Sequence, residues 1–383
     1  MSRQTLKFSV IIPTRERAEV LKSALRTVCE QDYDGLSIIV SDNFSQDDTA
    51  EVVHSFDDPR IRHVNTGRRL SMSHNYAFAL SHVEDGWVTI LGDDDALMPG
   101  AIARVAELAA ETGVEAVRSS FCKYRWPMGG SGGRLNVPLS KGTEMRDSAQ
   151  WLQKVIDGKA GYTDLPMLYT GGFADKKLMD IIRDRMGGYY SSCVPDVFSG
   201  VAIASITQRY LFSNEPLAIA GVSRHSTGTH HFSRMQTADE VTPIQKFLSE
   251  ENIPFHPDIP VCSDGITPRS PQVIFLESYL QSAPLRDALP PNFHAHQLEV
   301  IAAESDGTDA DLTQWMKDFA ALHGLDYGAA FKASRLPRLR ERIFGMPGRM
   351  LRKWKTAKLR YPRDDIGDVY SASLEAARLL TGR

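Results

Sequence analysis

Short apolar runs alternate with helix-forming segments over the first 120 residues, and this alternation constrains the fold more than any other feature. Four runs predict strands, at residues 8–13, 36–42, 61–65 and 87–91, and the first, second and fourth are apolar enough to be buried. The segments that follow them have helical spacing of apolar residues, at residues 19–31, 49–56, 71–83 and 99–111. With a further strand expected at 115–126, the pattern predicts βαβ units and an α/β fold with a mostly parallel sheet flanked by helices.

The rest of the chain is less regular. Helix and strand signals are mixed in its middle part and weaker later, and no internal repeat is present. A glycine-rich stretch, PMGGSGG, predicts a loop after the fifth strand. We therefore expect a sheet domain, a mainly helical extension and a basic amphipathic tail, at residues 1–235 (with halves 1–120 and 121–235), 236–330 and 331–383.

Composition excludes several classes of protein. A net charge of −4 gives no reason to expect nucleic acid as a partner. The four cysteines form no C-x-x-C pair, so neither a disulfide framework nor a zinc site is expected, and a reducing compartment is favoured. The apolar run near the N-terminus is short for a signal peptide, and no run reaches the ~18–20 residues of a membrane span. The sequence thus predicts a cytoplasmic protein.

Residues 331–360 differ from the rest in charge. They hold eleven Lys or Arg residues and one Glu, a net charge of +10, with Phe344 and Trp354 among them. Basic residues mixed with Trp, Phe and Leu are typical of a helix on an anionic membrane surface, here the inner face. The alternative is a solvated helical pair packed on the domain, because Pro337 and Pro347 interrupt any single long helix.

Polar, reactive sequences follow three of the predicted strands: PTRER, DNFSQDDT and DDD. In an open parallel sheet, ligands bind at the carboxyl ends of the strands. Asp93, Asp94 and Asp95 would repel one another and raise their pKa values unless a cation neutralised them. A helix cap accounts for one of the three acids. Mg²⁺ or Mn²⁺ with a phosphate-bearing substrate would account for all three.

Taken together, residues 7–112 resemble the family 2 glycosyltransferases of the GT-A fold. That family has Pro-Thr after the first strand, a D-[DN]-x-S-x-D-x-T segment after the second, and an Asn before a strand that D-x-D closes. The resemblance implies a Rossmann-like sheet and an inverting sugar transfer in surface polysaccharide or glycoconjugate synthesis. The donor would be a nucleotide-diphosphate sugar, with a UDP-sugar favoured, and the cofactor Mn²⁺ or Mg²⁺.

The resemblance also implies roles for single residues. Asp42 would bind the base, and Asp93 and Asp95 would be the D-x-D pair that faces the sugar and the metal. His225, in GVSRHSTGTHH, would be a further metal ligand or a donor to the diphosphate. Ser41 and His74 depart from the family pattern. The residues expected to bind the nucleotide sugar are Pro13, Thr14, Arg15, Glu16, Asp42, Asn43, Arg69, Asn75, Asp93 and Asp94.

Asp196 is the expected catalytic base. The segment VPDVFSG resembles the acceptor side of the family, which ends in an acidic pair, and Pro195 replaces the first acid here. An inverting transferase needs one carboxylate to take the proton of the attacking hydroxyl. A helix-terminal role for Asp196 is compatible with that function.

Two other functions compete with sugar transfer. A sugar-phosphate nucleotidyltransferase would need a glycine-rich loop after the first strand, and PTRER has no glycine. An inactive transferase-like scaffold is the second alternative. The acceptor stays open between a lipid-linked glycan, a soluble glycan and a protein, and residues 236–330 are expected to serve acceptor specificity or self-association.

Overall fold

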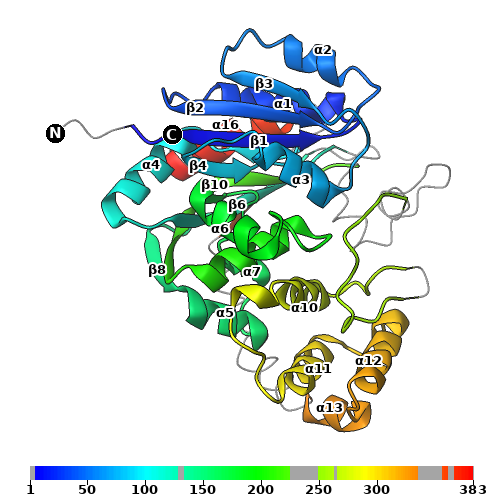
Figure 1. Ribbon diagram of the computed structural model, residues 1–383. Coiled ribbons are helices and arrows are strands. Elements are labelled where there is room, and N and C mark those ends of the chain that lie inside the picture. The colour runs from blue at the N-terminus through cyan, green and yellow to red at the C-terminus, as the bar shows by residue number, and fades with distance from the viewer. Residues whose placement is uncertain are drawn as a thin grey trace.

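The computed structural model shows an α/β part built on one sheet and, below it in Figure 1, a part made of helices. It describes residues 5–127, 133–224, 249–262, 265–334, 356–360 and 366–382.

The centre of the sheet is parallel, as the sequence predicts. Its strands lie in the order β4-β1-β2-β3, and all three pairings are parallel. Val10 packs with the apolar core on one face of the sheet and Ile11 with the core on the other, which explains the uninterrupted apolar run. These strands are β1 (Phe8–Thr14), β2 (Leu36–Asp42), β3 (Ile61–Asn65) and β4 (Trp87–Ile90).

Strands that follow β4 along the chain extend this centre. β9 pairs antiparallel with β4 and β6, while β10 runs parallel to β6 and antiparallel to β5 and β8. The predicted α/β class, with a mostly parallel sheet flanked by helices, is confirmed, and antiparallel pairs border the parallel centre. The strands are β5 (Ala96–Leu97), β6 (Ala116–Arg125), β7 (Arg134–Pro138), β8 (Thr143–Asp147), β9 (Gly172–Asp175), β10 (Arg209–Val222) and β11 (Thr356–Arg360).

Helices cover both faces of the sheet. Side chains of α1, α4 and α16 share a core with one face, and those of α3, α6 and α7 share a core with the other. Each of the four helices predicted in the first 120 residues forms, with shifted ends. The helices of this part are α1 (Ala18–Cys29), α2 (Thr49–His54), α3 (Met72–Leu80), α4 (Ala101–Thr112), α5 (Ser148–Ile156), α6 (Lys176–Met186), α7 (Pro195–Ile206) and α16 (Val369–Thr381).

The helical part has its own apolar core, around Trp315, Phe275 and Phe319. Val201 and Ala204 of α7 belong to this core, while Phe198 and Ala202 of the same helix belong to the core under the sheet. Helix α7 is therefore buried between the two parts. The helical part contains α10 (Pro271–Gln281), α11 (Phe293–Glu304), α12 (Ala310–Leu322) and α13 (Tyr327–Ala333).

Several helices begin at a side chain that accepts a hydrogen bond from a backbone N–H of the first turn. Such a cap satisfies one of the amides that the helix itself leaves unpaired. Ser270 before α10 acts together with Pro271, which suits the first helical position. The capping residues are Asp147, Asp175, Ser270, Asp309, Asp326 and Asp368.

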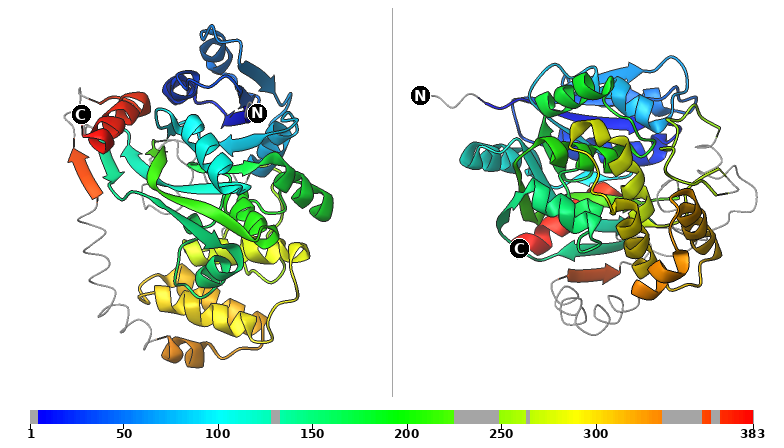
Figure 2. Two further views of the ribbon diagram at one scale, coloured as in Figure 1. Left: turned by 90° about the vertical axis from the view of Figure 1, so that its left-hand side faces the viewer. Right: turned by 60° about the horizontal axis from the view of Figure 1, so that its bottom comes forward.

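The C-terminal stretch returns to the sheet. α16, red in Figure 2, buries Val369, Ala372 and Ala376 in the core that α1 lines. Strand β11 pairs antiparallel with β7 at the edge of the sheet. Most of the basic segment expected in the tail, residues 335–355, lies outside the described residues, so its membrane role stays a prediction. The predicted boundaries at 235 and 330 also stay predictions.

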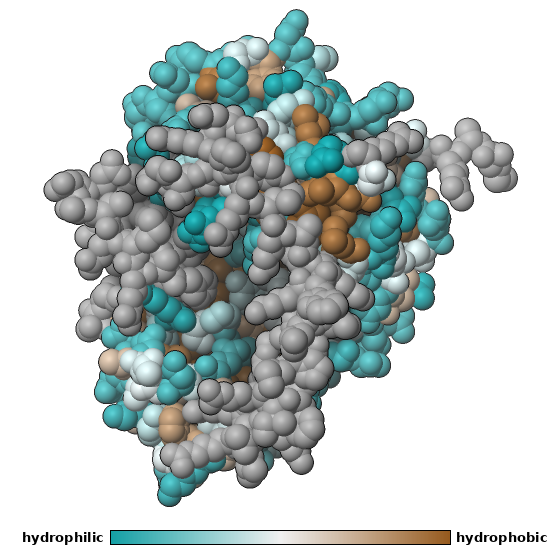
Figure 3. Space-filling model, turned by 180° about the vertical axis from the view of Figure 1, so that it is seen from behind, coloured by the Kyte–Doolittle hydropathy of each residue, from teal (hydrophilic) through white to brown (hydrophobic). Residues whose placement is uncertain are grey.

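The surface visible in Figure 3 is mostly hydrophilic, with one hydrophobic patch in its upper half. Large apolar side chains that are exposed are few and scattered along the described chain, including Phe44, Ile181 and Leu374. Over the part of the chain that the structure describes, none of the helices has the length and apolarity needed to cross a bilayer.

Helix α16 provides a test of this packing. We expect Val369→Asp to lower the free energy of unfolding by several kcal/mol, roughly 3 or more, because it places an unpaired charge in the core. Leu374→Asp is the matched control, since Leu374 is exposed on the same helix and its loss should change stability by less than about 0.5 kcal/mol. Urea unfolding measures both, and equal effects would show that α16 does not contribute to the core.

Candidate active site

The three consecutive acids lie at the carboxyl end of β4, beside the ends of β1 and β2. Asp93, Asp94 and Asp95 are each only 2–5% exposed. Buried carboxylates are costly unless hydrogen bonds or opposite charges compensate them. The groups that surround the three acids therefore define the site.

Asp93 is held by the segment after β1. Its Oδ2 accepts from the Thr14 hydroxyl at 2.8 Å, and its Oδ1 accepts from Arg17 at 2.9 Å. Burial raises the pKa of Asp93 in spite of the Arg17 charge. Burial alone would lower the pKa of Arg17, but Asp93 and Asp94 together raise it. The sequence analysis missed Arg17, although it is the second arginine of PTRER.

Asp95 accepts hydrogen bonds on both carboxylate oxygens. The Thr170 hydroxyl lies 2.6 Å from Oδ2, and the N–H of Gly221 lies 2.7 Å from Oδ1. Burial and then the charge of Asp94 raise the pKa of Asp95 to about 7. Thr170 has φ 31°, so a residue in a strained backbone conformation supplies this contact.

Asp94 is bound by the end of β10. The Ser223 hydroxyl donates to Asp94 Oδ2 at 2.6 Å. The backbones also approach closely here, since a Cβ at position 221 would lie 1.7 Å from the Asp94 carbonyl oxygen. Gly221 is therefore required for β10 to reach the acids.

Asp42 is fully engaged by protein groups. It accepts from the Ser45 N–H at 2.9 Å and from the Asn65 side chain at 2.9 Å, and His63 Nε2 lies 3.4 Å away. Burial acts to raise the pKa of Asp42, but the hydrogen bonds from His63, Ser45 and Asn65 outweigh it and lower the pKa. The predicted contact of Asp42 with the base stays a prediction, and in this structure Asp42 organises the loop after β2.

Asn43 and Asn75 also bond to neighbouring segments. Asn43 bonds the backbone N–H and C=O of Leu70 at 2.8 and 2.7 Å, which fixes the loop before α3. The side-chain oxygen of Asn75 accepts from Ser41 at 2.7 Å. Ser41, a departure from the family pattern, is thus the partner of a predicted donor-sugar residue.

The other predicted residues at the carboxyl edge of the sheet are Pro13 and three charged residues, Arg15, Glu16 and Arg69. Arg15 pairs with Glu250, and Arg69 pairs with Glu16 at 2.5 Å. Pro13 is half-buried, one residue before the end of β1. Arg15 thereby connects the edge to the segment that leads into the helical part.

Asp196 lies in the first turn of α7, where Pro195 is the first helical residue, and its side chain is half-buried. Burial raises the pKa of Asp196, while the backbone amides of Val197 and of Asp196 itself and the charge of Arg118 act to lower it. Asp196 is thus a carboxylate at the N-terminus of a helix. This position is compatible both with stabilising the start of α7 and with the predicted role as catalytic base.

Two tyrosines, Tyr76 and Tyr169, are affected both by Asp196 and by the acids after β4. Burial raises the pKa values of Tyr76 and Tyr169 well above the usual value, and nearby carboxylates add to the shift. Asp196 and Asp95 contribute to both tyrosines. Tyr76 and Tyr169 are therefore near both Asp196 and the acids after β4. Sequence reasoning missed both tyrosines, although Tyr76 follows the predicted Asn75.

A buried arginine supports the loop that reaches Asp95. Arg118 is 1% exposed and donates to the carbonyl oxygens of Thr163, Tyr169 and Thr170 at 2.8–2.9 Å. Burial lowers its pKa to about 10. Arg118 therefore holds in place the segment that presents Tyr169 and Thr170.

The acids offer a partial metal site. Oxygen donors, and more acids than the one arginine, Arg17, that pairs with them among the described residues, fit Mg²⁺ or Mn²⁺. Within the described ranges, however, no group of three or more His, Cys, Asp or Glu side chains is arranged to hold an ion by itself. His225, the other predicted ligand, lies outside the described residues. The residues thus fit an ion that diphosphate oxygens help to hold.

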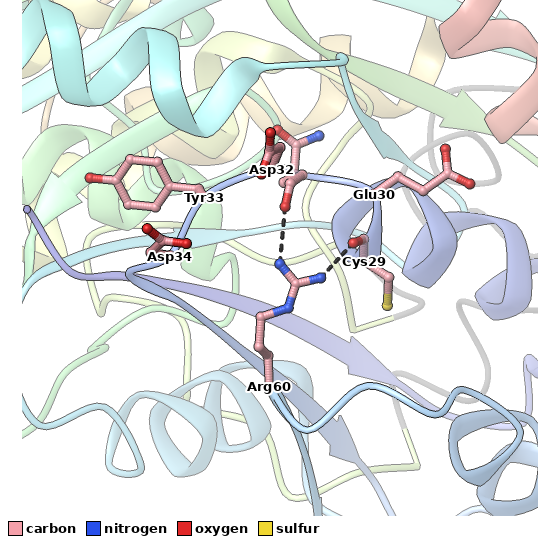
Figure 4. Close-up of a pocket in the computed structure, with 7 residues that line it drawn as sticks. Cys29, Glu30, Asp32, Tyr33, Asp34 and Arg60 are labelled. Carbon is pink, nitrogen blue, oxygen red and sulfur yellow. Dashed lines mark hydrogen bonds between the residues drawn. The ribbon is translucent and has the colours of Figure 1, made fainter.

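One cavity lies at the opposite edge of the sheet, near the amino ends of β2 and β3 (Figure 4), with a volume of about 450 Å³. Arg60 pairs with Asp58 and donates to the carbonyl oxygens of Cys29 and Gln31, so it caps the C-terminus of α1. These contacts give the cavity a structural explanation. It is lined by Cys29, Glu30, Gln31, Asp32, Tyr33, Asp34 and Arg60.

Comparison with known families and curated proteins shows similarity over the first part of the chain. Residues 9–160 match the model of the family described as glycosyl transferase family 2. A GalNAc(5)-diNAcBac-PP-undecaprenol beta-1,3-glucosyltransferase of Campylobacter jejuni is 38% identical over 108 residues, which cover 27% of this chain and 35% of that protein. An uncharacterized protein of Mycobacterium tuberculosis, MT1568, is 30% identical over 94 residues, 24% of this chain and 30% of that protein. The matched segment spans about a third of the length of these curated relatives.

Solved structures are similar at a lower level. Staphylococcus aureus TarS 1–349 in complex with UDP-GlcNAc gives a TM-score of 0.47 at 14% identity, covering 88% of this chain and 92% of that chain. The mannosyltransferase PcManGT from Pyrobaculum calidifontis, in complex with GDP-Man and Mn²⁺, gives 0.43 at 19% identity, covering 88% of each chain. At TM-scores below 0.5, these similarities carry no argument about the ligand.

The raised pKa of Asp95 predicts a pH dependence of stability. The folded state keeps a proton on Asp95 up to about pH 7, whereas the unfolded chain loses it near the usual value of 3.8. Folding therefore binds a proton in this window, and stability falls as the pH rises through it. We expect wild type to lose stability relative to Asp95→Asn between about pH 4 and pH 7.

Urea unfolding in chelator at several pH values measures this difference. Asp32→Asn is the control, since Asp32 is exposed at the opposite edge of the sheet, and this variant should follow wild type at each pH. A difference between wild type and Asp95→Asn that is constant from pH 4 to pH 8 would contradict the prediction.

Proposed function

Because residues 9–160 belong to glycosyl transferase family 2, we propose that this chain transfers a sugar from a nucleotide-diphosphate sugar to an acceptor hydroxyl, with inversion at the anomeric carbon. The observation that carries the proposal is the set of buried acids after β4 that Thr14, Arg17 and Thr170 hold in place. Asp196 is near them, because its charge and theirs raise the pKa values of the same two tyrosines, Tyr76 and Tyr169. These observations support a donor site and a general base in one region of the molecule.

The donor would bind along the carboxyl edge of β1, β2 and β4. Three adjacent buried acids, one of them with a pKa raised to about 7 by burial and by Asp94, support the placement of a metal diphosphate there. A bound divalent ion would supply electrostatic stabilisation of the leaving diphosphate, and Asp93 and Asp95 would hold it. The other residues proposed to bind the nucleotide sugar are Pro13, Thr14, Arg15, Glu16, Asp42, Asn43, Arg69, Asn75 and Asp94.

Arg17 joins this set on the basis of its contact with Asp93. A guanidinium at the edge of a diphosphate site stabilises negative charge that develops on the leaving group. Arg17 is already oriented by the carboxylate, so no reorganisation is needed when the donor binds.

Asp196 would act as the general base. It takes the proton of the acceptor hydroxyl, the oxygen attacks the anomeric carbon, and the bond to the diphosphate breaks on the opposite face. A carboxylate whose pKa burial has raised is a better proton acceptor near neutral pH than an exposed one. The amides at the start of α7 keep its charged form available in the resting enzyme.

A lipid-linked glycan is the acceptor that we favour. The Campylobacter relative is named for an undecaprenol-diphosphate-linked acceptor. The +10 charge of residues 331–360 supports contact with an anionic membrane, where such an acceptor would lie. A thermal-shift screen tests the class of donor, and a transfer assay tests the acceptor.

A thermal-shift screen tests the donor site. UDP-, GDP-, dTDP- and CMP-sugars, each with and without Mn²⁺, should include one whose binding raises the Tm only with metal, because ligand binding to the native state stabilises it. Asp95→Ala should remove that shift, and Asp32→Ala, at the opposite edge, should keep it. No shift with any nucleotide sugar would favour an inactive scaffold over an enzyme.

A transfer assay with a lipid-linked glycan tests the base. We expect Asp196→Asn to keep the donor-induced Tm shift and to lose transfer by about 10²–10⁴-fold, the usual contribution of a general base. Asp34→Asn, an exposed acid beside the cavity of Figure 4, is the control. Normal transfer by Asp196→Asn would mean that another group takes the proton.

A further inference from the structure

Ser192 joins three separate parts of the chain at the turn before α7. Its hydroxyl donates to Oε2 of Glu277 on α10 at 2.5 Å. The Ser192 hydroxyl oxygen accepts from the N–H of Val194 at 3.2 Å, and the Ser192 carbonyl accepts from the Ser73 hydroxyl at 2.6 Å. Ser192 is 0% exposed. The turn is thus held by α10 from one side and by α3 from the other.

The turn passes its orientation directly to Asp196. Val194 precedes α7, Pro195 is the first helical residue, and Asp196 follows it. Because the proline ring fixes φ near −65°, little freedom separates the turn from the carboxylate. A shift of Ser192 would therefore move Asp196.

Glu277 is a buried carboxylate on a helix that otherwise lines an apolar core. It is 1% exposed and lies on a helix whose neighbouring positions, Phe275, Leu276 and Tyr279, build the apolar core of the helical part. Burial raises the pKa of Glu277 to about 7, although the hydrogen bonds from Ser192, Gln281 and Ser278 act to lower it. An apolar side chain would be less costly at this position if packing were its only role.

We propose that Glu277 is a positioning residue, which fixes the turn carrying Asp196 through its hydrogen bond to Ser192. The helical part thereby acts on the transfer step as well as covering α7. This inference rests on the proposed function, because it requires Asp196 to be the base.

Three substitutions separate positioning from plain structural support. Ser192→Ala removes one hydroxyl, Glu277→Met removes the acceptor at similar length, and Glu277→Gln keeps a carbonyl acceptor. Ser205→Ala is the matched control, because the Ser205 hydroxyl lies on the same helix α7 and bonds to the Val201 carbonyl.

The single-turnover rate of transfer should fall about 10- to 100-fold in Ser192→Ala and Glu277→Met, as a small displacement of a catalytic group does. The donor-induced Tm shift and the donor Kd should stay within about twofold, since the donor site is untouched. Glu277→Gln should recover most of the rate. The double variant Ser192→Ala/Glu277→Met should transfer no more slowly than Ser192→Ala alone. Both changes remove the same hydrogen bond, between Ser192 and Glu277.

Wild-type rates in Ser192→Ala, or an equal loss of rate in Ser205→Ala, would overturn the inference. If Glu277→Met does not fold, the transfer rates of Ser192→Ala and Glu277→Gln decide whether Glu277 is a positioning residue. The proposed function fails separately, when wild type neither binds a donor nor transfers sugar, or when Asp196→Asn transfers normally. Loss of transfer in Asp196→Asn with a normal rate in Ser192→Ala would refute the positioning role alone.

Discussion

The compensation of buried negative charge after β4 determines how distant segments of this chain meet. Asp93 binds Thr14 and Arg17 from the start of the chain, Asp95 binds Thr170 from its middle, and the end of β10 reaches Asp94 through Ser223. Each contact compensates part of the cost of removing a carboxylate from water. Among the described residues Arg17 pairs with Asp93, and burial together with the repulsion from Asp94 raises the pKa of Asp95. A ligand that brings positive charge would relieve that repulsion.

Much of the first 120 residues could be predicted from the sequence because β1, β2 and β4 are buried on both faces. Such strands have few polar positions, and β2 was predicted with the ends that the structure gives. The ends of β3 were also correct, although Arg62 and Asn65 of this strand are exposed. Helix ends were less accurate. Pro99 suggested a first helical turn, yet α4 begins at Ala101 after Gly100 with φ 73°. The two-residue strand β5 was missed, since it forms only by pairing with β10, far along the chain.

The candidate site was predicted in outline, and what sequence reasoning missed depends on three-dimensional contacts. The motif after β1 drew attention to Thr14, Arg15 and Glu16, but the cation that binds Asp93 is Arg17. Arg118 lies in a predicted strand and Tyr169 and Thr170 lie just before β9, but only the fold brings these residues to the acids. Glu277 could not be identified either, since an acid within an apolar helical segment has no meaning before its partner Ser192 is known.

The packing of α16 against α1 has a consequence for how the protein is made. α1 leaves the ribosome long before α16, the helix that covers its apolar face and whose Tyr370 stacks on Arg26. Contacts of such long sequence separation form late, after much chain entropy has been lost. During synthesis the nascent sheet therefore keeps one apolar surface open until α16 emerges. A chain that stops before α16 would expose that surface to chaperones and to aggregation.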